Sequence, residues 1–218
     1  MSGWAEFAVA FGVFLASHMI PTRPRLRAAL VARLGPAGFG IVYSVLSTAL
    51  LVWLIGAAMR APYVQILPPW PALRWAAWIA MAPACLLIVA GMRVQNPFSF
   101  GGFGRVPFDP ARPGVLATTR HPLLAGLALW AGGHLLANGD LAFVILFGVF
   151  TGFALMGMVM IDRRKARLLT DWPDLARCTR RLSLRLWRPD VPTIVLALLV
   201  YAGLVWLHPI LIGVSPLP

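Results

Sequence analysis

Four histidines are the residues of this sequence whose type and position could do chemistry in an otherwise apolar chain: His18, His121, His134 and His208. His121 and His134 stand at the two ends of the uncharged run "HPLLAGLALWAGGH". Neutral imidazole nitrogens bind transition metals, and imidazoles from different membrane helices suit the two faces of a b-type haem. Gly132 and Gly133 would let a flat macrocycle approach the helix beside His134. The sequence therefore offers two interpretations: histidines that hold a haem b, or histidines that form hydrogen bonds at the membrane interface.

Other catalytic chemistry lacks its usual residues. The sequence has no Cys-x-x-Cys motif, nucleophile elbow, phosphate-binding loop or carboxylate pair, and Glu6 is its only glutamate. Cys85 falls in an apolar block and Cys178 in a basic segment, which argues against a structural disulfide between them. The sequence therefore lacks the residues that ordinary hydrolase or zinc chemistry requires.

The elements that must position the histidines are apolar blocks. Hydrophobic residues make up 60% of the 218 residues and charged residues 12%, which is typical of a polytopic membrane protein. Most blocks approach the ~20 residues that a helix needs to cross the hydrocarbon core. We expect an all-α membrane helix bundle with about six spans, forming one domain over 1–218. The blocks are 3–20, 38–59, 72–92, 121–137, 139–161 and 192–213.

The basic residues predict how these spans are oriented. The net charge is +12, and segments 21–37, 93–120 and 162–190 hold four, four and nine of the nineteen Lys and Arg residues. Basic loops stay in the cytoplasm, so both termini are expected on the outer side. Because the basic residues lie between apolar blocks and not along a soluble surface, we predict no nucleic-acid partner. Segment 162–190 is expected to lie on the anionic inner leaflet, whereas the Gly, Pro and Phe content of 94–114 forbids a regular helix.

This topology leaves the pairing of the histidines open. His18 ends the first span at the inner surface, level with His121, which opens the fourth. His134 lies thirteen residues beyond His121, about 20 Å further out at ~1.5 Å per residue. Depth alone therefore favours His121 as the partner of His18. Arg120 and His121, at a free helix N-terminus, could also form an anion-binding site.

Four stretches, in this order, resemble the NnrU family, which is similar to the plant 15-cis-zeta-carotene isomerase. They are "GVFLASHMIPTRPRLR", "QNPFSFGG", "RHPLLAGLALWAGGHLLANGD" and "DRRK". The resemblance implies a polytopic membrane protein whose haem b is held by His18 and His134. Together with the distribution of basic residues, it places the protein in the bacterial inner membrane with both termini in the periplasm. In the isomerase branch a cis double bond of a hydrophobic small molecule is isomerised when the iron is reduced. In the bacterial branch the context is nitric oxide and denitrification metabolism, with respiratory reductase components as partners.

Two other interpretations stay open. "RHPLLAG" also resembles the Arg-His-Pro motif by which membrane methyltransferases and sterol reductases hold a nucleotide-like cofactor. Those enzymes add an acidic, Tyr-rich element after the following span, and 162–181 contains neither Glu nor Tyr. The second interpretation is a non-enzymatic protein for haem supply or assembly, which needs the same ligands as the isomerase. Whether the protein is an enzyme is therefore left open.

Overall fold

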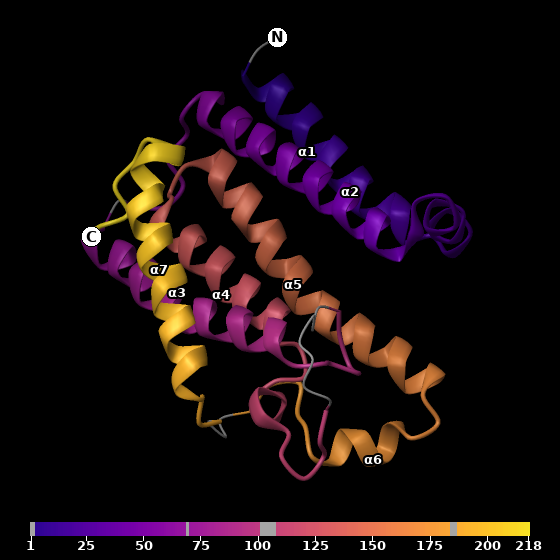
Figure 1. Cartoon of the computed structure of the whole chain (residues 1–218). Helices are drawn as coiled ribbons and strands as arrows, with labels where there is room; N and C mark the ends of the chain where they lie inside the picture. Colours follow the sequence, from indigo (N-terminus) through magenta and orange to yellow (C-terminus); the bar gives the residue numbers. More distant parts are fainter. Residues whose placement is uncertain (1–2, 69, 101–107, 184–186) are drawn as a thin grey trace. The chain divides into compact units, whose positions relative to one another are not determined.

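The computed structural model describes residues 3–68, 70–100, 108–183 and 187–218, and within them the chain is helical (Figure 1). The described residues contain no strand, only isolated bridge positions such as the pair Gln65 and Asp140. The all-α class predicted from composition is confirmed. The α-helices are α1 (Gly3–Met19), α2 (Pro24–Arg60), α3 (Pro71–Arg93), α4 (Pro122–Ala137), α5 (Leu141–Leu168), α6 (Trp172–Arg177) and α7 (Val191–Ile212).

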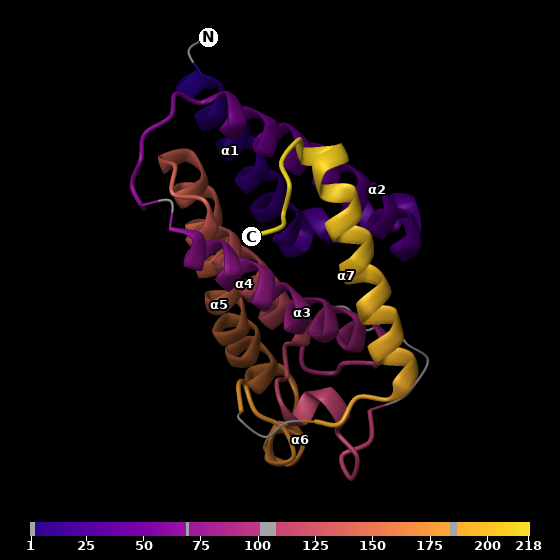
Figure 2. The same ribbon diagram turned by 90° about the vertical axis from the view of Figure 1, so that its left-hand side faces the viewer.

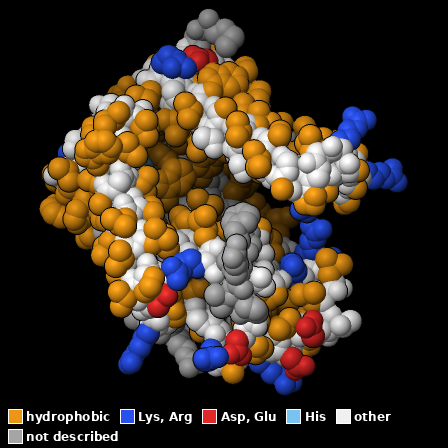
Figure 3. Space-filling view, viewed as in Figure 1, with side chains coloured by type: hydrophobic (Ala, Val, Ile, Leu, Met, Phe, Trp, Pro, Cys, Tyr) orange, Lys and Arg blue, Asp and Glu red, His pale blue; other side chains and the backbone are white. Residues whose placement is uncertain are grey.

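Four helices of the described part are long and apolar enough to cross a membrane, namely α2, α3, α5 and α7. The apolar helices α1 and α4 are shorter, at 17 and 16 residues. Hydrophobic side chains cover most of the helical surface in Figure 3, as a lipid-facing surface requires. The protein is therefore a membrane protein, as its composition predicted.

The chain divides into two units, which are described separately. Unit 1 comprises Met1–Ile66 and Asp140–Leu146. Its helices α1 and α2 run side by side (Figures 1 and 2). Arg60, at the end of α2, donates from Nε to Glu6 Oε2 near the start of α1, over 3.1 Å. This ion pair fixes the antiparallel arrangement of the hairpin.

The basic segment 21–37 is largely helical, although the sequence analysis counted it as a loop. Helix α2 starts at Pro24 and is interrupted at Gly35, whose backbone has φ 69° and ψ 165°. Pro36 follows directly, and proline suits the first position of a helix because that position needs no N–H donor. Pro24 and Pro36 therefore each start a helical stretch. Only the stretch that starts at Pro36 overlaps the apolar block 38–59.

Unit 2 comprises Leu67–Gly139 and Phe147–Pro218, and α3 is its central helix because it packs against both α4 and α7. The α3–α4 contact is close: a Cβ atom added at Gly126 would lie 2.9 Å from the carbonyl oxygen of Ala84. Helix α7 is tied to α3 by the Tyr201 hydroxyl, which donates to the Trp78 carbonyl oxygen over 3.1 Å. These contacts place the C-terminal ends of α4 and α7 within one unit.

Two apolar clusters complete unit 2. Leu124 and Ala125 of α4 pack with Ala154 and Met158 of α5. A second cluster lies under the loop that follows α3 and consists of Ala90, Phe98, Val115 and Leu116, with Trp172 against it. The described parts of the segment 94–114 form no α-helix, as predicted, while 101–107 lie outside the described residues. Helix α5 runs seven residues past the apolar block that ends at 161, so the basic segment 162–190 begins as a helix.

Candidate functional site

His134 lies in the last turn of α4, in unit 2, among aromatic rings. Its ring centroid is 5.4 Å from that of Trp130 and 5.1 Å from that of Phe147. Its Nδ1–H donates to the Trp130 carbonyl oxygen over 2.8 Å. A carbonyl oxygen can only accept, so Nδ1 carries the proton and Nε2 keeps its lone pair. In the described residues Nε2 has no hydrogen-bond partner, and this is the tautomer in which histidine binds a metal.

The two glycines before His134 differ in their surroundings. A Cβ atom added at Gly133 would lie 3.1 Å from Cα of Ala77 and 3.3 Å from Cβ of Ala80, so Gly133 packs α4 closely against α3. A Cβ atom added at Gly132 would meet only the Thr151 hydroxyl, at 4.0 Å. Of the two, Gly132 therefore has the more open side.

His18 ends α1 in unit 1 and has a similar local arrangement. Its Nδ1–H donates to the Phe14 carbonyl oxygen over 2.8 Å, and its Nε2 accepts from the Ser47 hydroxyl over 3.0 Å. The rings of Phe14 and Tyr43 flank the imidazole, with centroids 4.1 and 5.7 Å away. The Nε2 lone pair of His18 is thus engaged by a hydroxyl, which is a weak donor that a metal could replace.

His121 is fully buried at the start of α4 and is bonded to Asp162, near the end of α5. Its Nε2–H donates to Asp162 Oδ1 over 2.9 Å. The other carboxylate oxygen accepts from Arg181 Nε over 2.9 Å and lies 3.4 Å from a guanidinium nitrogen of Arg120. Asp162 therefore contacts the buried imidazole of His121, the mostly buried guanidinium group of Arg120 and the half-exposed guanidinium group of Arg181. Only Nδ1 of His121 remains for a ligand.

Arg120 is held from several sides. Its guanidinium carbon lies 5.1 Å from the ring centroid of Trp172, in a cation–π contact. Its backbone carbonyl accepts from Asn96 Nδ2 over 2.9 Å, and its backbone N–H donates to the Arg180 carbonyl over 2.7 Å. These bonds join the loop after α3, the start of α4 and the segment after α6 into one polar cluster.

Burial controls the protonation of this cluster. Burial lowers the pKa of His121 below its ordinary value. The desolvation of the charged imidazolium outweighs its attraction to the nearby Asp162 carboxylate. Burial also lowers the pKa of Arg120, again against the attraction of Asp162. His121 is therefore neutral at pH 7, and Asp162 is balanced by two arginines. Four buried side-chain atoms have no hydrogen-bond partner in the described residues, and two of them, His121 Nδ1 and Arg120 Nε, belong to this cluster.

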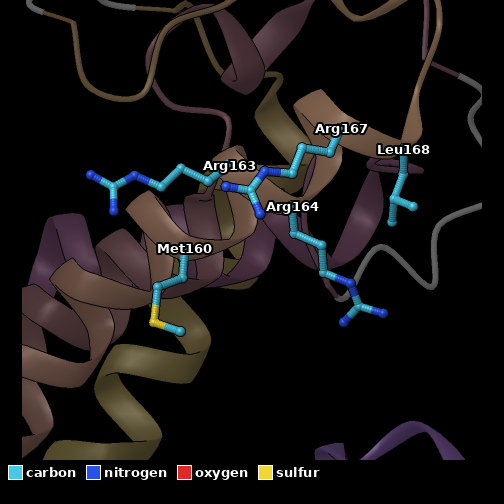
Figure 4. Close-up of a pocket in the computed structure, with 5 residues that line it drawn as sticks. All are labelled: Met160, Arg163, Arg164, Arg167 and Leu168. Atoms are coloured by element: carbon cyan, nitrogen blue, oxygen red, sulfur yellow. The ribbon is translucent and has the colours of Figure 1, made fainter.

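A shallow basic hollow lies at the C-terminal end of α5 (Figure 4). It is lined by Met160, Arg163, Arg164, Arg167 and Leu168. Its three arginines project from this one helix.

Arg120 and His121 both contact Asp162 in the structure. Asp162 was not among the site residues predicted from the sequence. A second pair that was not predicted is His134 with His208 of α7, whose ring centroids are 6.5 Å apart. The described residues contain no group of three or more His, Cys, Asp or Glu side chains that could hold a metal ion. A signal for the second pair was available in the predicted topology, which places both histidines near the ends of apolar blocks oriented in the same direction.

Comparisons with known proteins identify one family. A search of curated proteins and a search of solved structures each gave no match. The family model described as NnrU protein matches residues 6–216, nearly the whole chain and both units. The chain therefore belongs to the NnrU protein family.

Proposed function

We propose that this NnrU protein binds haem b in the membrane and that His134 is one of the axial ligands of the iron. The observation that carries the proposal is the fixed tautomer of His134: Nδ1–H is bonded to the Trp130 carbonyl, and Nε2 has no partner among the described residues. An outer hydrogen bond of this kind orients a ligating imidazole and raises its basicity.

The residues around His134 fit such a group. Trp130, Phe147 and Phe150 supply flat apolar surface, with the Trp130 ring 5.5 Å from Phe147 and 6.1 Å from Phe150 between centroids. Such flat apolar surface would favour the macrocycle of a haem over water. His18, which the family resemblance pairs with His134, has the matching tautomer in unit 1.

When bound, the haem would supply an iron that changes its oxidation state, and the chain's residues would set that potential through the ligands and the apolar surroundings. Two roles need such an iron: redox-gated cis–trans isomerisation of a hydrophobic substrate, and a step of nitric oxide or denitrification metabolism. We place the protein in the bacterial inner membrane with six crossings, α1 and α4 included, and with both termini in the periplasm. The basic segments that follow α1, α3 and α5 support this orientation.

Haem binding is tested by titrating haemin into the full chain, purified in detergent, and recording the absorption spectrum. The wild type should show a sharp Soret band, and resolved α and β bands after reduction, as iron with two imidazoles does. His134→Ala should lose these bands, whereas Asn138→Ala, one turn further at the same helix end, should keep them. A wild type without a Soret band would refute the proposal.

The alternative ligand His121 is tested in the same experiment. Its Nε2 is already bonded to Asp162, so we expect His121→Asn to keep the low-spin spectrum wherever the variant folds. Loss of the bands in folded His121→Asn, with the bands kept in His134→Ala, would place the haem near the cytoplasmic surface instead.

A further inference from the structure

One face at the C-terminal end of α5 lines the basic hollow of Figure 4. Three of the lining residues are arginines (Arg163, Arg164 and Arg167, the α5 arginines), and Met160 and Leu168 complete the lining. These positions have the spacing i, i+3, i+4, i+7 and i+8, which places them on one side of an α-helix. The hollow has a volume of about 440 Å³, within the range of small-molecule sites. It therefore offers a ligand three guanidinium groups from one helix.

The acidic residue nearest in sequence to the α5 arginines belongs to the opposite face of the helix. Asp162 is two positions after Met160, about 200° around the helix, and its side chain is buried. Its carboxylate oxygens contact His121, Arg120 and Arg181. Among the ion pairs of the described residues, none includes an α5 arginine. The positive charges of the hollow therefore have no carboxylate in direct contact within the described part of the chain.

The α5 arginines are exposed and are neighbours on the helix surface. Arg163 and Arg167 are four positions apart, and Arg164 and Arg167 are three apart, so their like charges repel. A guanidinium group binds a phosphate through two parallel N–H···O bonds, and a phosphate between two such groups replaces their repulsion by attraction. The charge and the geometry of the hollow thus favour a phosphate group as its ligand.

The position of the hollow on α5 indicates the source of that phosphate. Helix α5 is long and apolar enough to cross a membrane, and its apolar block ends at Ile161, just before the α5 arginines. The hollow extends from Met160 to Leu168, about 12 Å along the helix axis at ~1.5 Å per residue. It therefore reaches from the depth of the acyl chains to that of the headgroups. These two apolar side chains are 60% and 65% exposed, and a lipid would cover them, whereas a free phosphate ion would not.

We propose that the hollow binds the headgroup of one anionic phospholipid from the leaflet at which α5 ends. The α5 arginines hold the phosphate oxygens, and Met160 contacts the apolar part of the lipid next to its headgroup. This is a site for a single lipid at a defined place, which differs from the general attraction of basic segments to an anionic membrane. It does not depend on haem binding, because the lining includes no histidine.

Native mass spectrometry of the full chain, purified in detergent, tests the site by counting bound lipids. The wild type is titrated with phosphatidylglycerol, which is anionic, and with phosphatidylcholine, which carries a phosphate but no net charge. The first phosphatidylglycerol should bind at a lower concentration than the first phosphatidylcholine. With all three α5 arginines replaced by glutamine, the affinity for that phosphatidylglycerol should fall at least about tenfold, since each arginine at an anionic surface contributes about fivefold.

The matched control removes three exposed arginines from the basic start of α2, where they lie at different angles around the helix. Its substitutions are Arg25→Gln, Arg27→Gln and Arg33→Gln. This control has the same net charge as the α5 variant but keeps the hollow, so its affinity should stay close to that of the wild type. Size-exclusion profiles and far-ultraviolet circular dichroism establish that both variants are folded. If the triple α5 variant does not fold, Arg167→Gln against Arg27→Gln gives the same comparison, with a loss of about fivefold.

Each contrary result would overturn the proposal. Equal losses in the α5 variant and the α2 control would show that only total charge attracts the lipid, and the α5 arginines would then be ordinary cations favoured at a helix C-terminus. An α5 variant that binds like the wild type, or a wild type without preference for phosphatidylglycerol, would exclude the hollow as a lipid site. Inorganic phosphate at millimolar concentration should leave the bound lipid in place, and displacement of the lipid would identify a site for a free anion instead.

Discussion

The Nε2 atom of His121 lies 2.9 Å from Oδ1 of Asp162, and the two residues are 41 positions apart in the sequence. The imidazole is fully buried, and the carboxylate side chain is 6% exposed. A buried carboxylate is tolerated only where charges and donors compensate it, and here Arg120, Arg181 and His121 do so. The pair thus ties the start of α4 to the end of α5.

The first prediction concerns the cost of breaking this cluster. Asp162→Asn removes the charge that balances Arg120 and leaves a buried guanidinium without its counter-ion. We expect the free energy of unfolding to fall by about 3 kcal/mol. Asp174→Asn is the matched control, since its ion pair with Arg177 is largely exposed and should contribute less than about 1 kcal/mol. Denaturant titration in micelles measures the free energy of unfolding of both variants. Equal losses in the two variants would contradict the stabilising role of Asp162.

The second prediction concerns pH. Burial lowers the pKa of His121 in the folded state, so the unfolded state binds more protons as pH falls. The contribution of His121 to stability is present above its unfolded pKa, about 6.5, and is lost as pH falls through the lower folded value. We expect the wild type to lose stability below about pH 6.5, by up to about 1.4 kcal/mol per pH unit from this group.

His121→Gln, which cannot titrate, serves as the reference for this pH effect. The variant should lose less stability than the wild type between pH 7 and pH 5, while the other histidines contribute alike to both proteins. Parallel pH profiles of the two proteins would rule out His121 as the titrating group.

The third prediction concerns the contact between α3 and α4. A methyl group at Gly126 would lie 2.6 Å from Ile88 Cγ1 and 2.9 Å from the Ala84 carbonyl oxygen, so the helices would have to separate. Gly126→Ala should destabilise the protein by about 1–3 kcal/mol. Gly152→Ala on α5 adds the same methyl group where no atom lies within 4 Å and should be neutral or mildly stabilising. Thermal unfolding in detergent compares them, and a stable Gly126→Ala variant would contradict the close packing.

The fourth prediction is topological. A reporter fused after Pro218 should be active in the periplasm, and one inserted near Lys165 should be active in the cytoplasm. Alkaline phosphatase and green fluorescent protein fusions measure the two sides. A reversed result at either position would contradict the predicted topology.

The fifth prediction separates haem binding from the cofactor site of methyltransferases and sterol reductases. In the structure the Arg120 guanidinium and the His121 imidazole both contact Asp162, so binding a nucleotide-like cofactor would require breaking buried contacts. Calorimetric titration with S-adenosylmethionine or with a reduced nicotinamide should therefore show no binding at micromolar concentration. A clear isotherm that disappears in His121→Asn would instead favour the Arg-His-Pro interpretation.

Much of the helical architecture could be predicted from local sequence. Apolar blocks near the length of a membrane span became helices, because a backbone in lipid must satisfy its hydrogen bonds within the segment. The Gly- and Pro-rich part that precedes Gly114 formed no α-helix in its described residues. The helical stretch from Pro24 to Gly35 was not predicted. It lies outside the apolar block, and its arginines led to its interpretation as a basic loop.

The candidate site was predictable only in part. The four histidines were evident from their type and from their surroundings. The partners of these histidines were not evident. Asp162 is an acidic residue within a strongly basic segment, and nothing in the neighbouring sequence marks it as the partner of a histidine. Gly133 illustrates the same limit: its use in helix packing depends on Ala77, 56 positions away, which only the α3–α4 contact reveals.

The sequence by itself determined a basic, multi-span, all-helical membrane protein whose reactive groups are imidazoles, because hydropathy, span length and charge are properties of local segments. The tertiary structure alone decided that His121 meets Asp162 and that His134 meets His208. Those pairings depend on which helices pack together and on how each is rotated. Small residues such as Gly126 and Gly133 set that packing at the α3–α4 contact, and the Tyr201–Trp78 bond sets it at α3 and α7.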